Sequence, residues 1–243
     1  MTDGARLTAA PHSEKERAIP KVIAVDGSAA SGKSTVGRRL AEQLGYPFLD
    51  TGLMYRAVAL AALDRGIDLN DQPALAQLAA GIHLEVGPPK PATSETCSII
   101  LDGVDVTPEL RRSDVEDAVS LVSRVGAVRE ALVRQQREIA GRQPMVMAGR
   151  DIGTVVLPNA DLKVYLDASI AERARRRHAE FSNRGRGVTR EVVLEDLRRR
   201  DQIDTERAVS PLRPAEDAVV IATDGLTQEE VLARVLALVD GSG

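Results

Sequence analysis

A glycine-rich segment near the N-terminus, GSAASGKS at residues 27–34, fits the pattern G-x-x-x-x-G-K-[ST] at every fixed position. Gly27 and Gly32 can take positive φ, which lets successive backbone N–H groups converge on an anion. Lys33 would reach the outer phosphates, and the Ser34 hydroxyl would be placed to ligate Mg²⁺. The segment therefore predicts a phosphate-binding loop rather than a glycine-rich turn that binds nothing. Its residues are Gly27, Ser28, Ala29, Ala30, Ser31, Gly32, Lys33, Ser34 and Thr35.

Three further segments carry residues that could hold a second anion. LDTGLMYRAV and AGRDIG each place polar or charged residues directly after an apolar run. RRRDQIDTERAVSPL places two arginines and an aspartate at spacings of four and three, on a common face of one predicted helix. Arginine presents a planar fork that grips phosphate through two hydrogen bonds. The segments therefore predict a second phosphate site, formed by Thr51, Arg56, Arg150, Asp151, Arg200, Asp204 and Arg207.

Each of these residues also has a plainer interpretation. Arg56 could be a solvated charge on a helix, and Arg150 with Asp151 could be a surface ion pair. The face that carries Arg200 could be an exposed ladder of ion pairs. The arginine-rich run RARRRH at 173–178 fits either a solvated helix face or a lid that closes over ATP, and the sequence does not choose among Arg173, Arg175, Arg176 and Arg177.

The elements that would position these residues are read from hydrophobic periodicity and from glycine and proline. Five apolar runs read as strands, at 21–27, 46–52, 144–151, 162–168 and 218–225. Helices are predicted at 35–45, 53–66, about 71–80, 114–140 with a break near Gly126, 170–182, 189–206 and 227–239. This alternation predicts an α/β fold with a parallel sheet covered on both faces. Ligands of such sheets bind at the carboxyl ends of the strands, where the polar segments lie.

Composition limits the classes of function. Aromatic residues make up 2% of the chain, tryptophan is absent and the net charge is −4, so neither a nucleic-acid partner nor a membrane surface is favoured. One cysteine and three scattered histidines argue against a disulfide or a zinc site. No apolar run approaches a membrane span, and residues 1–20 resemble a polar, disordered tail rather than a secretion signal. A cytoplasmic protein is predicted.

Other classes that use this phosphate loop fit less well. A GTPase should carry an N-K-x-D string, and the sequence has none. A motor or transporter ATPase should show an apolar strand that ends in paired acids, and no predicted strand ends so. A small-molecule kinase needs little besides a phosphate loop, a second anion site and a lid. A kinase for another metabolite, such as UMP, and a non-catalytic ATP-binding regulator stay open as alternatives.

Four segments together make the sequence recognisable: IAVDGSAASGKST, LDTGLMYRAVALAAL, GRDIGTVVLPNADLKVYLDAS and DTERAVSPLRPAEDAVVIATDGLT. They strongly resemble the bacterial cytidylate kinase family, and the likeness runs from about residue 21 to the C-terminus. Short strand-like pieces at 82–108 resemble the family's extra β-region. The resemblance implies a single domain over 21–243 with the three-layer fold of P-loop nucleoside monophosphate kinases: a five-stranded parallel sheet, a small antiparallel insert, a monophosphate-binding region at about 52–130 and a helical lid at about 170–206.

The resemblance also implies an activity and roles for the residues. The reaction would be transfer of the γ-phosphoryl group of ATP to CMP or dCMP, assisted by Mg²⁺ and carried out by a monomer. Lys33, Arg150, Arg200 and Arg207 would be catalytic. The acceptor phosphate would be held by Thr51, Arg56, Arg150, Arg200 and Arg207, the base would be read by Ser120, Arg129 and Asp151, and the ribose would be bound by Asp204.

Overall fold

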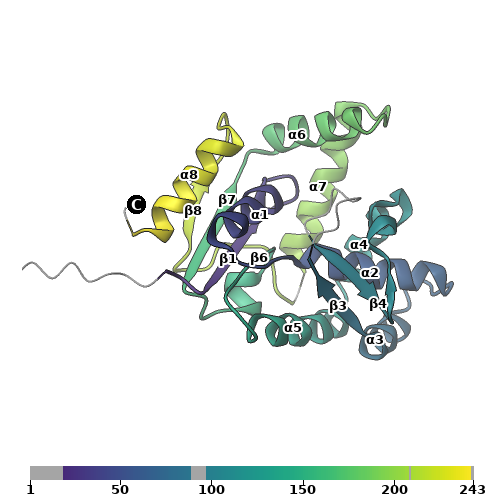
Figure 1. Ribbon diagram of the computed structural model, residues 1–243. Helices are drawn as coiled ribbons and strands as arrows, with labels where there is room; N and C mark the ends of the chain where they lie inside the picture. The colour runs from purple at the N-terminus through teal and green to yellow at the C-terminus, as the bar shows by residue number, and fades with distance from the viewer. Residues whose placement is uncertain (1–18, 89–96, 208, 242–243) are drawn as a thin grey trace, which may run out of the picture.

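The computed structural model describes residues 19–88, 97–207 and 209–241. The predicted tail at 1–20 lies almost entirely outside these residues. Eight strands and eight α-helices follow one another along the described chain, together with one 3₁₀ and one π-helical turn. Figure 1 shows the sheet strands in the middle of the molecule with helices on both sides.

The five predicted strands form one parallel sheet in the order β2-β6-β1-β7-β8. The chain order and the spatial order differ, because β6 enters between β2 and β1. This brings the ends of β1 and β6 side by side, with Asp26 opposite Gly149. The strands are β1 (Val22–Gly27), β2 (Phe48–Asp50), β6 (Met145–Gly149), β7 (Leu162–Asp167) and β8 (Val219–Ala222).

Side-chain alternation along these strands creates two cores, one on each face of the sheet. Ile23 and Val25 of β1 pack into the core beneath α1 (Lys33–Leu44) and α8 (Gln228–Val239). Ala24 points to the other face, into the larger core. That core is covered by α2 (Thr51–Asp64), α3 (Gln72–Gly81), α4 (Ser113–Ser123) and α5 (Gly126–Ala140). The predicted three-layer α/β fold is confirmed.

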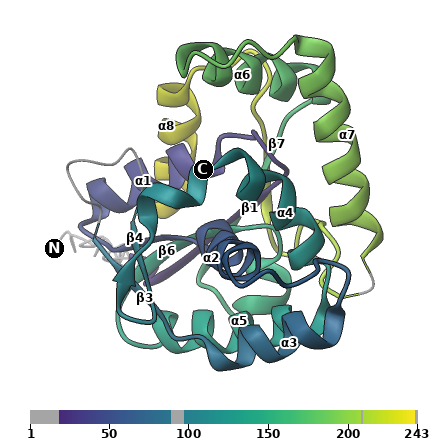
Figure 2. The ribbon, with the colours of Figure 1, turned by 90° about the vertical axis from the view of Figure 1, so that its right-hand side faces the viewer.

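The insert is also confirmed, and the segment predicted to be a helical lid consists of two helices. The strands β3 (Leu84–Gly87), β4 (Ser98–Leu101) and β5 (Val104–Asp105) form a separate antiparallel sheet. The helices α6 (Ile170–Asn183) and α7 (Arg190–Glu206) pack on each other around a small core of their own, which contains Phe181, Val193 and Leu197. Figure 2 shows α6 and α7 above α4 and α2, with α3 and α5 on the opposite side.

Several element boundaries differ from the predicted ones. α1 begins at Lys33 and α2 at Thr51, two residues earlier than expected in both cases, so the lysine and the threonine lie in the first turns of helices. α7 ends at Glu206, and Arg207 has extended backbone (φ −62°, ψ 137°). Arg207 is therefore not on the helix face where the spacing placed it. A 3₁₀ turn (Thr107–Arg111) and a π-helical turn (Ile152–Val156) were not predicted.

In the described ranges, no helix has the length and apolar character needed to cross a membrane. The same ranges contain no group of three or more His, Cys, Asp or Glu side chains that could hold a metal ion.

Candidate active site

A cavity of about 440 Å³ opens at the carboxyl ends of β1, β2 and β6, beneath α6 and α7. Every residue of the predicted second anion and base site lines it, although these residues span positions 51 to 207. The phosphate loop contributes the residues from Ala29 onward except Ser31. Gly27, Ser28 and Ser31 do not line the cavity. The predicted lining residues are Ala29, Ala30, Gly32, Lys33, Ser34, Thr35, Thr51, Arg56, Ser120, Arg129, Arg150, Asp151, Arg200, Asp204 and Arg207.

The phosphate loop depends on two glycines for its shape. Gly27 has φ of 156°, and a Cβ atom there would lie 2.6 Å from the carbonyl oxygen of Leu166. Gly32 precedes α1 with φ of 98°, a conformation that side chains with a Cβ rarely adopt. The N-terminal amides of α1 therefore face the cavity, where the helix dipole favours an anion.

Lys33 is 7% exposed, and its Nζ donates a hydrogen bond of 3.0 Å to the Ser28 carbonyl oxygen. Burial, and next the positive charge of Arg150, lower the pKa of Lys33 to about 7. Both effects disfavour the ammonium in an empty pocket. A bound polyanion would reverse them, so the lysine is suited to phosphate.

A buried ion pair forms part of the predicted second anion and base site. Arg129 and Asp151 are 1% and 4% exposed, and Arg129 Nη2 donates to Asp151 Oδ2. The Arg129 guanidinium also lies 5.2 Å from the centre of the Tyr55 ring. Arg129 Nε is buried without a hydrogen-bond partner in the described part of the chain. The pair therefore offers both a carboxylate and a spare N–H donor to a ligand.

A second set of charges surrounds Asp204. Arg150 Nε donates to Asp204 Oδ2 at 2.8 Å, and Arg207 Nη1 donates to Oδ1 at 3.4 Å. Burial by itself would raise the pKa of Asp204, but Arg150 and Arg207 lower it below its usual range. Arg207 keeps this contact from beyond the end of α7 because its Nε donates to the Ser210 carbonyl oxygen.

The remaining residues of the predicted second site also line the cavity. Thr51 Oγ1 donates to the Ala148 carbonyl oxygen at 3.0 Å. Arg56 Nη1 donates to the Leu110 carbonyl oxygen at 3.0 Å, and burial lowers the pKa of Arg56 to about 10. Arg200 Nη2 donates to the Glu116 carbonyl oxygen at 3.0 Å. Ser120 lines the cavity from α4. Arg56 and Arg200 are thus not solvated surface charges.

The family model described as cytidylate kinase matches residues 23–241. The chain belongs to the cytidylate kinase family. It is 48% identical to the cytidylate kinase of Chloroflexus aggregans, over 90% of this chain and 93% of that one. It is 49% identical to the cytidylate kinase of Pelotomaculum thermopropionicum, over 89% and 95%. The enzyme of Rhodococcus jostii is 48% identical, over 90% and 94%. The resemblance found in the motifs is confirmed.

Membership of the family makes this chain a phosphotransferase with a nucleoside monophosphate kinase reaction. The cavity agrees with such a reaction, since it joins a phosphate loop to a second, arginine-rich half. Membership of this family excludes a GTPase and a motor ATPase.

The arginines of α6, among which the sequence could not choose, make different contacts in the structure. Arg173 and Arg176 bond the phosphate-loop backbone, at the carbonyl oxygens of Ala29 (3.3 Å) and Ser31 (3.1 Å). Arg177 lines the cavity. Arg175 is 61% exposed and pairs with Glu172. In this cytidylate kinase family member, α6 is therefore tied to the phosphate loop from one side and reaches the cavity from the other.

Of two aspartates at strand ends, Asp50 was missed as a site residue, whereas Asp26 was a candidate from the sequence to support Mg²⁺ through water. Asp50 accepts a 2.6 Å hydrogen bond from Ser34 Oγ and also caps α2 through Gly52 N. Asp26 accepts from Ile152 N (2.8 Å) and Gly153 N (2.7 Å). Asp26 thereby holds the π-helical turn that follows Asp151, and burial raises its pKa to about 6. The available signal was their position at the carboxyl ends of apolar strands.

Proposed function

We propose that this chain transfers the γ-phosphoryl group of ATP to CMP and dCMP, giving ADP with CDP or dCDP. The observation that carries the proposal is the buried Arg129–Asp151 pair in the same cavity as the phosphate loop. Cytosine presents an amino donor at N4 and acceptors at N3 and O2. Asp151 would accept from N4, Arg129 would donate to the acceptor edge, and Ser120 would assist from α4.

Discrimination against uracil follows from the same pair. Uracil would turn an oxygen toward the Asp151 carboxylate, and this group is 4% exposed and so has little access to water. An unpaired buried polar group costs about 1–3 kcal/mol, which predicts about 5- to 150-fold selection against UMP. The guanidinium of Arg207 also lies near this carboxylate, with its Nη2 atom 4.0 Å from Asp151 Oδ1.

The acceptor phosphate and sugar would be held by the remaining side chains of the cavity. Arg150 and Arg207, with Arg56, Arg200 and Thr51, would surround the phosphate. Asp204 would bond the ribose hydroxyls from between Arg150 and Arg207. Arg207 Nη2 is buried without a hydrogen-bond partner among the described residues, so a phosphate oxygen would satisfy it.

The residues present fit Mg²⁺. Ser34 Oγ and Asp50 Oδ2 lie 2.6 Å apart at the N-terminus of α1, and oxygen atoms of this kind are the ligands that Mg²⁺ prefers. Ser34 would hold the ion, with Asp50 directly beside it. The ion would supply charge neutralisation for the phosphates of ATP.

The reaction would need alignment rather than a strong base. An oxygen of the acceptor phosphate, already an anion near neutral pH, forms a bond to the γ-phosphorus. The bond from that phosphorus to the bridging oxygen breaks, and ADP leaves with the electron pair. Lys33, Arg150, Arg200 and Arg207 would stabilise the charge on the transferred group. The lid, α6 and α7, would exclude water and so limit ATP hydrolysis.

The decisive experiment measures ADP production from Mg·ATP with CMP, dCMP, UMP, AMP and GMP as separate acceptors. The proposal expects fast turnover with CMP and dCMP and slow or no turnover with the purines. Comparable turnover with UMP would retain the kinase but refute the base-reading site. Acceptor-independent ADP formation, or none, would refute the kinase proposal.

Asp151→Asn tests the base-reading pair itself. The amide can donate to an oxygen at position 4, so selectivity for CMP over UMP should fall by about 5- to 150-fold. The ratio of kcat/KM for the two acceptors measures this, with Asp240→Asn at the exposed end of α8 as the matched control. An unchanged ratio would show that Asp151 does not read the base.

A further inference from the structure

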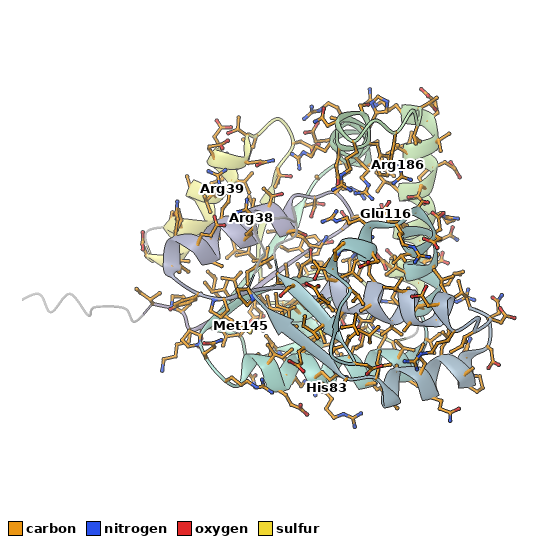
Figure 3. All side chains as sticks on the ribbon, turned by 45° about the vertical axis from the view of Figure 1, so that its right-hand side comes forward. Arg38, Arg39, His83, Glu116, Met145 and Arg186 are labelled. Atoms are coloured by element: carbon orange, nitrogen blue, oxygen red, sulfur yellow. The ribbon has the colours of Figure 1, made fainter. Side chains whose placement is uncertain are left out.

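One carboxylate outside the cavity lining gathers arginines from two parts of the molecule. Glu116 of α4 accepts hydrogen bonds from Arg177 Nη2 at 3.0 Å and Arg186 Nη1 at 2.8 Å, and a longer one from Arg56 Nη1 at 3.5 Å. Its side chain is only 3% exposed. Figure 3 shows Arg186 at the base of the lid, directly above Glu116. A single buried carboxylate therefore joins α2 and α4 to the lid.

An aromatic ring of the lid contacts two of the arginines that bond Glu116. Phe181 is buried in the small core between α6 and α7. The guanidinium groups of Arg177 and Arg186 lie 4.4 Å and 4.3 Å from the centre of its ring. Cation–π contacts of this kind restrict the orientation of long arginine side chains. Both arginines are therefore held in place for Glu116 by the lid's own packing.

The backbone adds a fourth contact, since Arg200 of α7 donates to the Glu116 carbonyl oxygen at 3.0 Å. Arg56, Arg177 and Arg200 all line the cavity, whereas Glu116 does not. Any effect of Glu116 on a bound nucleotide must therefore pass through these arginines. The cluster defined by Glu116, Arg177, Arg186 and Phe181 is called the lid joint below.

The charge balance of the lid joint links it to anionic substrates. Burial by itself would raise the pKa of Glu116, but Arg177, Arg56 and Arg186 lower it to about 2, so the carboxylate is ionised near neutral pH. Three guanidinium groups face Glu116, and one of them, Arg177, also pairs with Glu180 at 2.8 Å. Three guanidinium groups against two carboxylates leave an excess of positive charge at the rim of the cavity. A buried carboxylate that loses its partners is strongly destabilised. The contacts of Glu116 thus favour the arrangement in which the lid lies against α4.

We propose that Glu116 is a positioning residue: through the lid joint it holds α6 and α7 over the cavity and aims Arg56 and Arg177 at the phosphates of bound nucleotides. This inference rests on the proposed function, because it takes nucleotides as the occupants of the cavity. The excess positive charge is neutralised when those phosphates bind, so closure and binding support each other.

The first test is steady-state kinetics of Glu116→Gln, which keeps the shape and removes the charge. Opening the lid lowers the fraction of binding-competent enzyme, and apparent affinity falls by that fraction. The KM values for ATP and CMP should both rise about tenfold, while kcat at saturation stays within about threefold. Asp117→Asn removes the same charge from the neighbouring, exposed position of α4 and should change none of these three constants. Thermal unfolding of each variant reports whether the fold is kept.

The second test is a double-mutant cycle with Arg186, which is 35% exposed and does not line the cavity. Amide hydrogen exchange across residues 177–189 is measured without nucleotide, so the result does not depend on which acceptor the enzyme uses. Arg186→Gln and Glu116→Gln should each accelerate exchange, and the double variant should exchange no faster than Glu116→Gln. Arg198→Gln, at an exposed position of α7, is the control.

The outcomes separate the two proposals. Additive effects of the two substitutions, or unchanged exchange in both single variants, would overturn the lid joint even if the enzyme phosphorylates CMP. Unchanged KM values in Glu116→Gln would overturn its positioning role. A wild-type enzyme without CMP-dependent ADP production would overturn the proposed function and with it the aim of the arginines at nucleotide phosphates.

Discussion

The two halves of the cavity are built differently. The half proposed to bind ATP, called the ATP half below, is formed by six residues of the phosphate loop at 27–35, whose shape follows from two glycines and the start of α1. The half proposed to bind the acceptor, called the acceptor half below, draws side chains from α2, α4, α5, α7, the residues after β6 and Arg207 beyond α7. Its charged groups are paired with one another, as in Arg129 with Asp151 and Arg150 with Asp204.

The two halves differ in how their polar groups are held before a ligand binds. In the ATP half, backbone sterics fix the amide positions before any phosphate arrives, so little reorganisation is needed. In the acceptor half, internal ion pairs satisfy buried charges until a ligand shares or replaces them, because an unpaired buried charge is costly. We therefore expect substitutions in the ATP half to affect all turnover, and those in the acceptor half to act through one substrate.

The largest effect is expected from Lys33→Met. Removing the ammonium takes away charge stabilisation of the transferred group, so kcat should fall by about 100- to 1000-fold with every acceptor. ADP production with CMP measures this, and the exposed Lys21→Met is the control. A decrease below tenfold would show that the lysine does not act in the transition state.

Arg150→Ala should lower kcat/KM for CMP by about 100-fold, because a charged hydrogen bond to the acceptor phosphate is lost and Asp204 loses a partner. The dissociation constant of ATP, measured by calorimetry, should change by less than about threefold. Turnover of CMP within about threefold of the wild type would exclude Arg150 from the acceptor site. An equal loss of ATP affinity would remove the distinction between the halves.

Proton uptake on ATP binding tests the ATP half in the enzyme without any substitution. Because the pKa of Lys33 is lowered to about 7, the lysine is mostly neutral at pH 8 in the empty enzyme. Bound phosphates favour the ammonium, so ATP binding at pH 8 should take up most of one proton, and the uptake should decrease as the pH falls below 7. Calorimetry in two buffers of different ionisation enthalpy measures this. Lys33→Met should abolish the uptake, and persistence in that variant would assign the proton to another group.

The smallest effect is expected far from both halves. Thr227 and Glu230 form a reciprocal cap at the start of α8. Thr227→Ala should lower the free energy of unfolding by about 1 kcal/mol, which corresponds to a Tm decrease of about 2–4 °C. Thermal unfolding measures the shift. The kcat and both KM values should not change, and a kinetic effect would mean that α8 influences the cavity.

The sequence by itself determined the ATP half and most of the elements. The phosphate loop is local: two glycines, a lysine and a serine within eight residues suffice, because strand, loop and helix follow one another along the chain. The same is true of the Thr227 cap and of the break at Gly126 between α4 and α5. The resemblance to the family also indicated which residues to propose for the acceptor site, but not which hydrogen bonds and ion pairs hold their side chains.

Only the tertiary structure decided the contacts of the acceptor half. Insertion of β6 between β2 and β1 brings the chain after Gly149 beside the phosphate loop, and no local pattern reports strand order. Helical spacing placed Arg207 on α7, yet the helix ends at Glu206 and the arginine reaches Asp204 from extended backbone. Glu116, surrounded by arginines 60 to 70 positions away in the sequence, was invisible for the same reason. Ion pairing over such distances depends on how layers pack, which periodicity along one element does not encode.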